Sequence, residues 1–127
     1  MKKEYRVKSE KDFQRVFKAG TSVANRQFVV YSLPKSENDH YRVGLSVSKR
    51  LGNAVKRNEI KRRIRHSIRL LDQEWGIQPN FDLIIIARQP VSQMNFDQIY
   101  SSLTHVFNLA GLFIQSPTKK ESTNPEI

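Results

Sequence analysis

Hydrophobic and polar positions in the first part of the chain predict one helix followed by extended segments. Ser9 with Asp12 three positions later resembles a capping box, and apolar residues then repeat at helical spacing, so we expect a helix over residues 10–19. Residues 21–33 are rich in Val, Phe and Tyr, which favour strands. A polar pair divides this segment, which predicts a short strand, a turn and a longer strand over residues 27–33.

The central part of the chain combines two strand patterns with one long helix pattern. Residues 41–48 alternate apolar and polar positions, which predicts a strand with one buried face, in a hairpin with the strand before it. Asn53 suits a helix cap, and the apolar residues after it form one helical stripe. The stripe consists of Ile60, Ile64, Ile68, Leu71 and Trp75. The apolar run within residues 81–87 lacks polar alternation and predicts a strand covered on both faces.

A last amphipathic helix begins at Asn95, where Gln98 three positions later suits a helix start, and ends at Gly111. The order is helix, two or three strands, helix, strand, helix, which predicts an α+β fold with one small sheet. The 127 residues show no repeat or linker and suit a single domain, which we place at residues 1–114. Residues 115–127 are polar and hold two prolines, a composition typical of a disordered tail.

Composition and charge narrow the class of partner. The chain has no cysteine, which excludes disulfides, iron–sulfur clusters, thiol catalysis and cysteine-based zinc sites. The formal net charge is +10, and residues 1–66 alone carry 18 basic and six acidic side chains. This excess predicts an anionic partner: nucleic acid, an acidic membrane surface or an acidic protein. Because no apolar run suits a bilayer span or a signal peptide, we expect a cytoplasmic location.

The most informative segment is 49–65, where eight of 17 residues are basic and one is acidic. On a helix, the residues opposite the apolar stripe are Asn58, Arg62, Arg65 and Arg69, with Lys61 on the flank. Arginine grips phosphate oxygens with two N–H groups, and the helix start near Ala54 adds free backbone N–H groups. Alternatives are a solvated charged face and a membrane-surface helix, the latter disfavoured because the stripe must cover the sheet.

The same segment resembles the signature of the bacterial ribonuclease P protein subunit. The spacing Ala-Val-x-Arg-Asn-x-x-Lys-Arg-x-x-Arg is intact from Ala54 to Arg65. Shorter matching motifs lie at residues 12–17, 26–28, 42–48 and 82–88. The resemblance covers residues 5–112, and a motif of this length with consistent flanks is specific.

The resemblance implies three helices and a four-stranded mixed sheet in α-β-β-β-α-β-α order. It also implies a left-handed crossover between the strands near residues 45 and 84, although general handedness rules favour a right-handed one. The implied activity is endonucleolytic removal of the 5′ leader from precursor tRNA, with a catalytic centre in the RNA subunit that uses Mg²⁺. The protein would bind that RNA and precursor tRNA, extend the substrate contact and lower the magnesium requirement; DNA and membranes are not expected partners.

Two binding surfaces follow from the resemblance. The surface for the RNA subunit comprises Lys49, Arg50, Asn53, Arg57, Asn58, Lys61, Arg62, Arg65 and Arg69. The surface for the single-stranded leader comprises Phe13, Phe17, Ser22, Tyr31, Arg57, Asn58 and Lys61. Aromatic side chains stack on unpaired bases with little sequence demand. From its spacing alone, however, the phenylalanine pair fits core packing better than a binding cleft.

No catalytic residue and no metal site are predicted in this chain. His40, His66 and His105 are scattered, and none has a spaced partner for acid–base or metal chemistry. Two further alternatives predict different behaviour. A structural RNA-binding protein, such as a ribosomal component or an RNA chaperone, would bind RNA without changing cleavage. A metal-dependent nuclease would cut RNA by itself.

Overall fold

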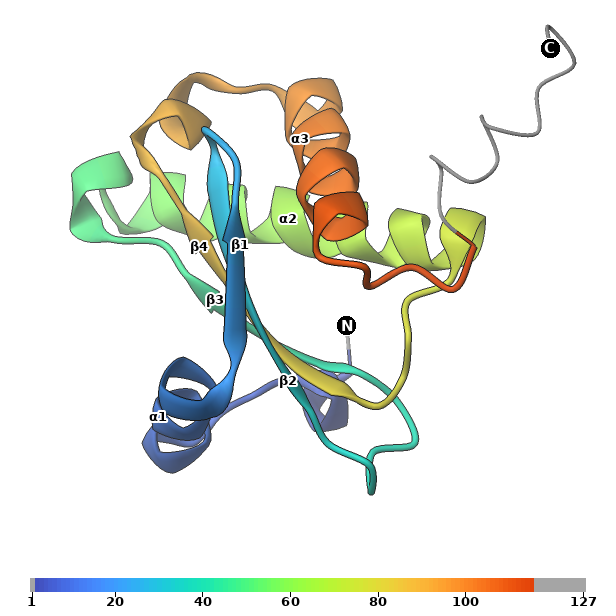
Figure 1. Cartoon of the computed structure of the whole chain (residues 1–127). Coiled ribbons are helices and arrows are strands. Elements are labelled where there is room, and N and C mark those ends of the chain that lie inside the picture. Colours follow the sequence, from blue (N-terminus) through green and yellow to red (C-terminus); the bar gives the residue numbers. More distant parts are fainter. Residues whose placement is uncertain (1, 116–127) are drawn as a thin grey trace, which may run out of the picture.

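A four-stranded mixed sheet organises the chain in the computed structural model, which describes residues 2–115 (Figure 1). The strands are β1 (Thr21–Ala24), β2 (Phe28–Pro34), β3 (Arg42–Ser46) and β4 (Phe81–Ala87), in the spatial order β1-β2-β4-β3. The helices are α1 (Glu10–Ala19), α2 (Ala54–Trp75) and α3 (Phe96–Leu109), with short 3₁₀ helices η1 (Lys3–Tyr5), η2 (Lys49–Leu51) and η3 (Gln89–Gln93). The predicted α+β class, with three helices and a four-stranded mixed sheet, is confirmed. Apart from Gln115, the tail predicted at 115–127 lies outside the described residues.

The predicted hairpin between β2 and β3 is wrong. β4 lies between them, antiparallel to β2 and parallel to β3. The reason is the apolar run of β4, in which Leu83, Ile84 and Ile85 are all fully buried. A strand that is apolar on both faces is most stable at the centre of a sheet, where both faces are covered. The hairpin that does form joins β1 to β2.

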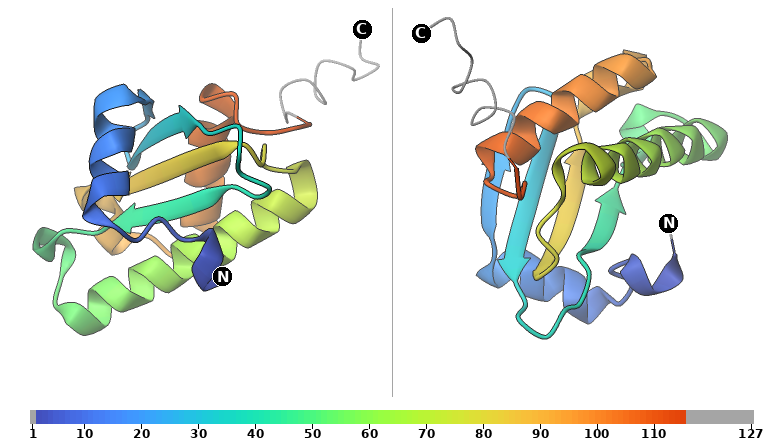
Figure 2. Two further views of the ribbon diagram at one scale, coloured as in Figure 1. Left: turned by 90° about the horizontal axis from the view of Figure 1, so that it is seen from below. Right: turned by 90° about the vertical axis from the view of Figure 1, so that its right-hand side faces the viewer.

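The two faces of the sheet carry different helices (Figures 1 and 2). α2 and α3 pack on one face, where the stripe of α2 meets Phe28 and Val30 of β2 in the main core. α1 lies on the opposite face. Successive side chains of a strand alternate between faces, so Ile84 points toward α1 while Leu83 and Ile85 point into the core. One face therefore holds the long basic helix, and the other holds the short aromatic one.

The predicted helix starts are confirmed with one difference. The side chain of Asn53 accepts a hydrogen bond from the backbone N–H of Lys56, and Asn95 forms a full capping box with Gln98. The Ser9 hydroxyl likewise accepts from the N–H of Asp12. The Asp12 carboxylate, however, lies near two arginine side chains instead of completing the box. One of these is Arg15 of α1 itself, and the other, Arg42, links the first turn of α1 to β3.

Ile64→Ala is expected to destabilise the fold by about 2–5 kcal/mol, because it removes a fully buried side chain and leaves a cavity. Urea unfolding measures this change in the free energy of unfolding. Val55→Ala, on the same helix, is the matched control, because Val55 is 75% exposed and its loss should change stability very little. Equal losses for the two variants would contradict the role of the stripe in holding α2 against the sheet.

Candidate nucleic-acid interface

The basic helix α2 begins at a turn that requires glycine. Gly52 has a φ angle of 143°, and a Cβ atom there would lie 2.6 Å from Cγ of Lys56. Nε of Arg57 donates a hydrogen bond to the carbonyl oxygen of Gly52 at 3.2 Å. The turn, the Asn53 cap and the Arg57 side chain thus form one local structure, which fixes the start of α2 relative to η2.

The residues predicted to meet the RNA subunit lie on η2, on α2 and at the Asn53 cap between them, and we call this set the basic face. Its exposed members are Lys49, Arg50, Asn53, Asn58, Arg62 and Arg69, and its half-buried members are Arg57, Lys61 and Arg65. Within residues 2–115, none of the seven cations of this face forms an ion pair with a carboxylate. Among the described residues, no carboxylate at ion-pair distance offsets their mutual repulsion, and an external anion would relieve it.

The basic face includes a hollow that sequence reasoning did not foresee. The hollow, about 450 Å³ in volume, is lined by Arg6, Arg62, Arg63, Arg65, His66 and Arg69. Burial and the nearby charge of Arg6 lower the pKa of Arg65 from its ordinary value. Arg6 reaches this helix because its backbone forms a bridge with Val43 of β3. No local sequence signal reveals that contact, which depends on long-range pairing.

Arg63 differs from its neighbours on α2. It forms an ion pair with Glu59, one turn earlier, and donates to the carbonyl oxygen of Met94 at 3.3 Å. Its side chain is therefore already bonded within the protein, on the flank of α2 that faces α3. Although Arg63 also lines the hollow, these bonds make it a suitable control for the cations of the basic face, which form no ion pair in the described part of the chain.

The aromatic residues predicted for the leader lie together on the opposite side of the sheet. Phe13 and Phe17 of α1 and Tyr31 of β2 form a row of half-buried rings, which we call the aromatic platform. The Phe17 and Tyr31 rings meet edge to face at 5.0 Å, and the Phe13 and Phe17 centroids lie 6.4 Å apart. Ser22 of β1 is exposed and pairs in register with Tyr31. The structure thus brings four predicted leader residues together.

The other three predicted leader residues are not joined to the platform. Arg57, Asn58 and Lys61 lie on α2, which packs on the other face of the sheet. Within residues 2–115, no hydrogen bond, ion pair or ring contact connects any of them to the platform rings. Seen from the α1 side, α2 nevertheless runs along the β3 edge and remains in view beyond it (Figure 2, left). A ligand that reached both groups would have to cross that edge.

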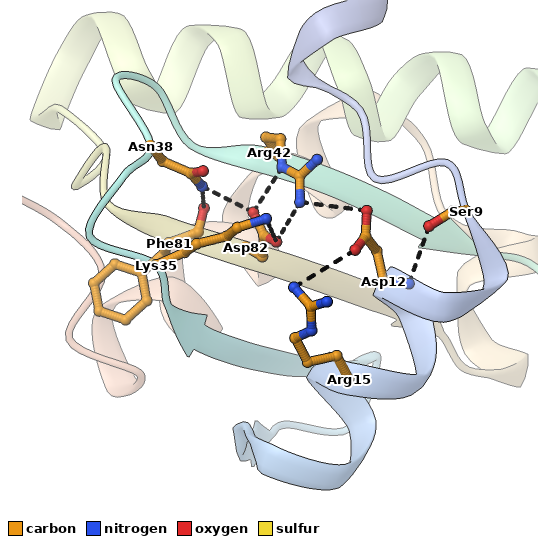
Figure 3. Close-up of polar contacts among 8 residues, drawn as sticks. All are labelled: Ser9, Asp12, Arg15, Lys35, Asn38, Arg42, Phe81 and Asp82. Carbon is orange, nitrogen blue, oxygen red and sulfur yellow. Dashed lines mark hydrogen bonds and ion pairs between the residues drawn. The ribbon is translucent and has the colours of Figure 1, made fainter.

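A buried ionic cluster lies beside the platform and was also missed (Figure 3). Asp82 of β4 is 1% exposed, and Arg42 of β3 donates to both of its oxygens, from Nε at 2.9 Å and from Nη2 at 2.6 Å. Asn38 donates to Oδ1 at 2.9 Å, and Lys35 lies 3.8 Å from Oδ2. Burial would raise the pKa of Asp82, but the bonds from Arg42 and Asn38 and the nearby charges hold it below its ordinary value. The one feature of the sequence that could have revealed this cluster is the acidic residue Asp82 within an apolar strand.

Acidification is expected to lower the free energy of unfolding, because it protonates Asp82. Because its pKa is lower in the folded than in the unfolded protein, its charge stabilises the fold above the unfolded pKa, and that contribution is lost as pH falls through the folded pKa. Urea unfolding from neutral to acid pH measures the loss. The Asp82→Asn variant should be less stable at neutral pH and lose less on acidification. An equally steep loss in that variant would assign the effect to other carboxylates.

Comparison with known proteins decides the family. A family model described as Ribonuclease P matches residues 1–111. The chain belongs to the ribonuclease P protein family. A ribonuclease P protein component from Exiguobacterium sibiricum is 53% identical over 113 residues, which cover 89% of this chain and 96% of that relative. The resemblance seen in the α2 signature is therefore confirmed.

Solved ribonuclease P proteins share the fold. The Staphylococcus aureus RNase P protein is 51% identical, with a TM-score of 0.78, and the match covers 86% of this chain and 97% of that one. A second structure, a mutant of the same protein with defective mRNA degradation activity, is 50% identical with a TM-score of 0.79. That match covers 87% of this chain and 92% of the mutant.

The histidines of this ribonuclease P family member lie apart from one another. His40 stacks on Tyr5 with centroids 3.5 Å apart, and His66 lies 4.9 Å from the Phe96 ring. Nδ1 of His105 lies 3.3 Å from Nδ2 of Asn25. Within residues 2–115, no three His, Asp or Glu side chains gather as metal ligands, and no helix has the length and apolar character of a membrane span.

Proposed function

We propose that this chain is the RNA-binding subunit of a ribonuclease P ribonucleoprotein that removes the 5′ leader from precursor tRNA in the cytoplasm. The observation that carries the proposal is the pair of surfaces on opposite sides of one sheet: a basic face without carboxylate partners and a half-exposed aromatic platform. The family membership supports the same role.

The basic face would bind the catalytic RNA subunit. Arg62 and Arg69 are exposed on the outer side of α2, where their guanidinium groups are free to bind phosphate oxygens. The hollow beside them adds Arg6 and His66, so the phosphate-binding surface extends from α2 to the N-terminal segment. Each phosphate that is neutralised releases counterions from the RNA, which makes the binding depend steeply on salt.

The platform would hold the leader as an extended single strand. Stacking of unpaired bases on Phe17 and Tyr31 requires little sequence specificity, which suits a leader of variable sequence. The leader backbone would cross the β3 edge to reach Arg57, Asn58 and Lys61 at the start of α2. The contact would extend substrate binding beyond the tRNA body and favour the precursor over the mature product.

The chemical step would belong to the RNA subunit and its Mg²⁺ ions, with none of the chain's residues acting as a catalyst. By placing positive charge between closely spaced phosphates, the protein would reduce the magnesium that the RNA needs to fold and to bind substrate. The S. aureus mutant is defective in mRNA degradation activity, so degradation of mRNA is the second candidate function for this chain.

Single-turnover cleavage of a 5′-extended precursor tRNA at low magnesium tests the proposal, and the same assay with an mRNA tests the second candidate. The three conditions are the cognate RNA alone, the protein alone, and both together. The proposal predicts cleavage at the mature 5′ end only in the mixture. Cleavage by the protein alone would place a catalytic centre in this chain. Binding without faster cleavage would leave a structural RNA-binding protein.

A further inference from the structure

Arg42 lies between two carboxylates that belong to different parts of the fold (Figure 3). One is Asp82 on the neighbouring strand, which accepts two hydrogen bonds from the Arg42 guanidinium group. The other is Asp12 in the first turn of α1, whose Oδ2 lies 3.6 Å from Nη2 of Arg42. The side chains of Arg42 and Asp12 are 22% and 23% exposed, so solvent only partly screens this ion pair. Arg42 thus links α1 to the centre of the sheet.

The link lies next to the aromatic platform. Phe13 directly follows Asp12, and its ring rests on Gly44, two residues after Arg42 on the same face of β3. A Cβ atom at Gly44 would lie 2.6 Å from Cζ of Phe13, so no larger residue fits under the ring in this position. Two adjacent residues of α1 are therefore held by two positions of one strand.

We propose that Asp12 and Arg42 are positioning residues for the leader: their ion pair sets where α1 sits over the sheet and thereby fixes the aromatic platform. This inference rests on the leader site proposed above. We do not expect Arg42 itself to bind phosphate, because the carboxylates of Asp12 and Asp82 already engage its guanidinium group. The acidic residues beside the platform belong to this positioning device, although they repel RNA.

The direction in which leader binding changes distinguishes a positioning role of Asp12 from a purely electrostatic one. Removing a negative charge near an RNA site should strengthen RNA binding, if charge alone matters. Removing the charge of Asp12 should instead weaken leader binding, if its ion pair holds α1 in place. Glu10, two residues earlier in the same helical turn, provides the matched control, because it is exposed and forms no ion pair within residues 2–115.

The test compares Asp12→Asn with Glu10→Gln in the reconstituted holoenzyme, using precursor tRNA and mature tRNA as ligands. We expect Asp12→Asn to lower the ratio of precursor to mature affinity about threefold, the scale of one partly exposed ion pair. Glu10→Gln should leave the ratio unchanged. Arg42→Lys keeps the charge but loses the two-pronged bond to Asp82, and it should lower the ratio as well. A ratio unchanged in both Asp12→Asn and Arg42→Lys would overturn the proposal.

A spectroscopic measurement on the free protein tests the positioning itself. The Gly44 α-proton that takes the place of a Cβ atom points toward the Phe13 ring, so its NMR chemical shift reports where α1 sits. The shift should move in Asp12→Asn and stay in place in Glu10→Gln. A lower affinity ratio without that movement would make Asp12 a direct contact and overturn the inference. If the unmodified holoenzyme showed no preference for precursor tRNA, the leader site would fail, and the Gly44 shift would still decide the positioning.

Discussion

Lys61→Ala is expected to weaken the binding of precursor tRNA by the holoenzyme about tenfold, because hydrogen bonds to charged groups contribute about 1.5–3 kcal/mol. Binding of mature tRNA should be almost unchanged, since it has no leader. Arg57→Ala should behave in the same way, with an added stability loss from its bond to the carbonyl oxygen of Gly52. Equilibrium binding of the two tRNAs to each variant holoenzyme gives both affinities.

The comparison of the two tRNAs makes this prediction specific. Lys61 lies on the flank of the apolar stripe of α2 and is half-buried. If it served only the general positive field of the protein, its removal would weaken both tRNAs to the same extent. Equal losses would therefore contradict leader contact at this end of α2.

The double substitution Arg62→Ala with Arg69→Ala is expected to lower affinity for the RNA subunit about a hundredfold, by removing two phosphate contacts. The plot of log affinity against log salt should also become less steep by about 1.4–1.8, since each phosphate contributes about 0.7–0.9 to the slope. The ratio of precursor to mature affinity should stay near that of the unmodified protein once holoenzyme has formed. Binding titrations over a range of salt concentrations measure both changes.

Arg63→Ala is the matched control for that variant. It removes the same kind of charge from the same helix, but its side chain is bonded to Glu59 and to the carbonyl oxygen of Met94. Its effect on the salt slope should therefore be much smaller than that of either outward-facing arginine. If Arg63→Ala and Arg62→Ala changed the slope equally, the basic face would act as a diffuse field instead of a set of phosphate contacts.

Local sequence patterns predicted most of the helices and strands. The stripe from Ile60 to Leu71, the apolar run of β4 and the Asn53 and Asn95 caps each depend on residues close in sequence, and the structure confirms them. The strand order was not predictable in this way. Alternation shows that β3 has one buried face, but it does not show which strand is its neighbour. The position of β4 between β2 and β3 follows from the whole sheet.

The candidate site also has one part that local sequence predicts and one part that depends on long-range contacts. The basic face is contiguous in sequence, so its cations could be recognised from one motif. The contacts of Arg6 with α2 and of Arg42 with Asp82 join residues far apart in the chain, and they exist only after the strands have paired. The ring of Phe13 on Gly44 likewise depends on how α1 crosses β3. Spacing on α1 alone could not distinguish a platform from a core.

Photo-crosslinking shows whether the leader of a bound precursor tRNA lies on the aromatic platform. A precursor tRNA with a photoreactive uridine in its leader would be bound to the complete holoenzyme, irradiated, and the attached peptides mapped by mass spectrometry. We expect crosslinks to the peptides that contain Phe13, Phe17 and Tyr31, and their loss when the same uridine is placed in the mature tRNA body. Crosslinks from the leader to α3, with none to α1 or β2, would contradict a leader site on the platform.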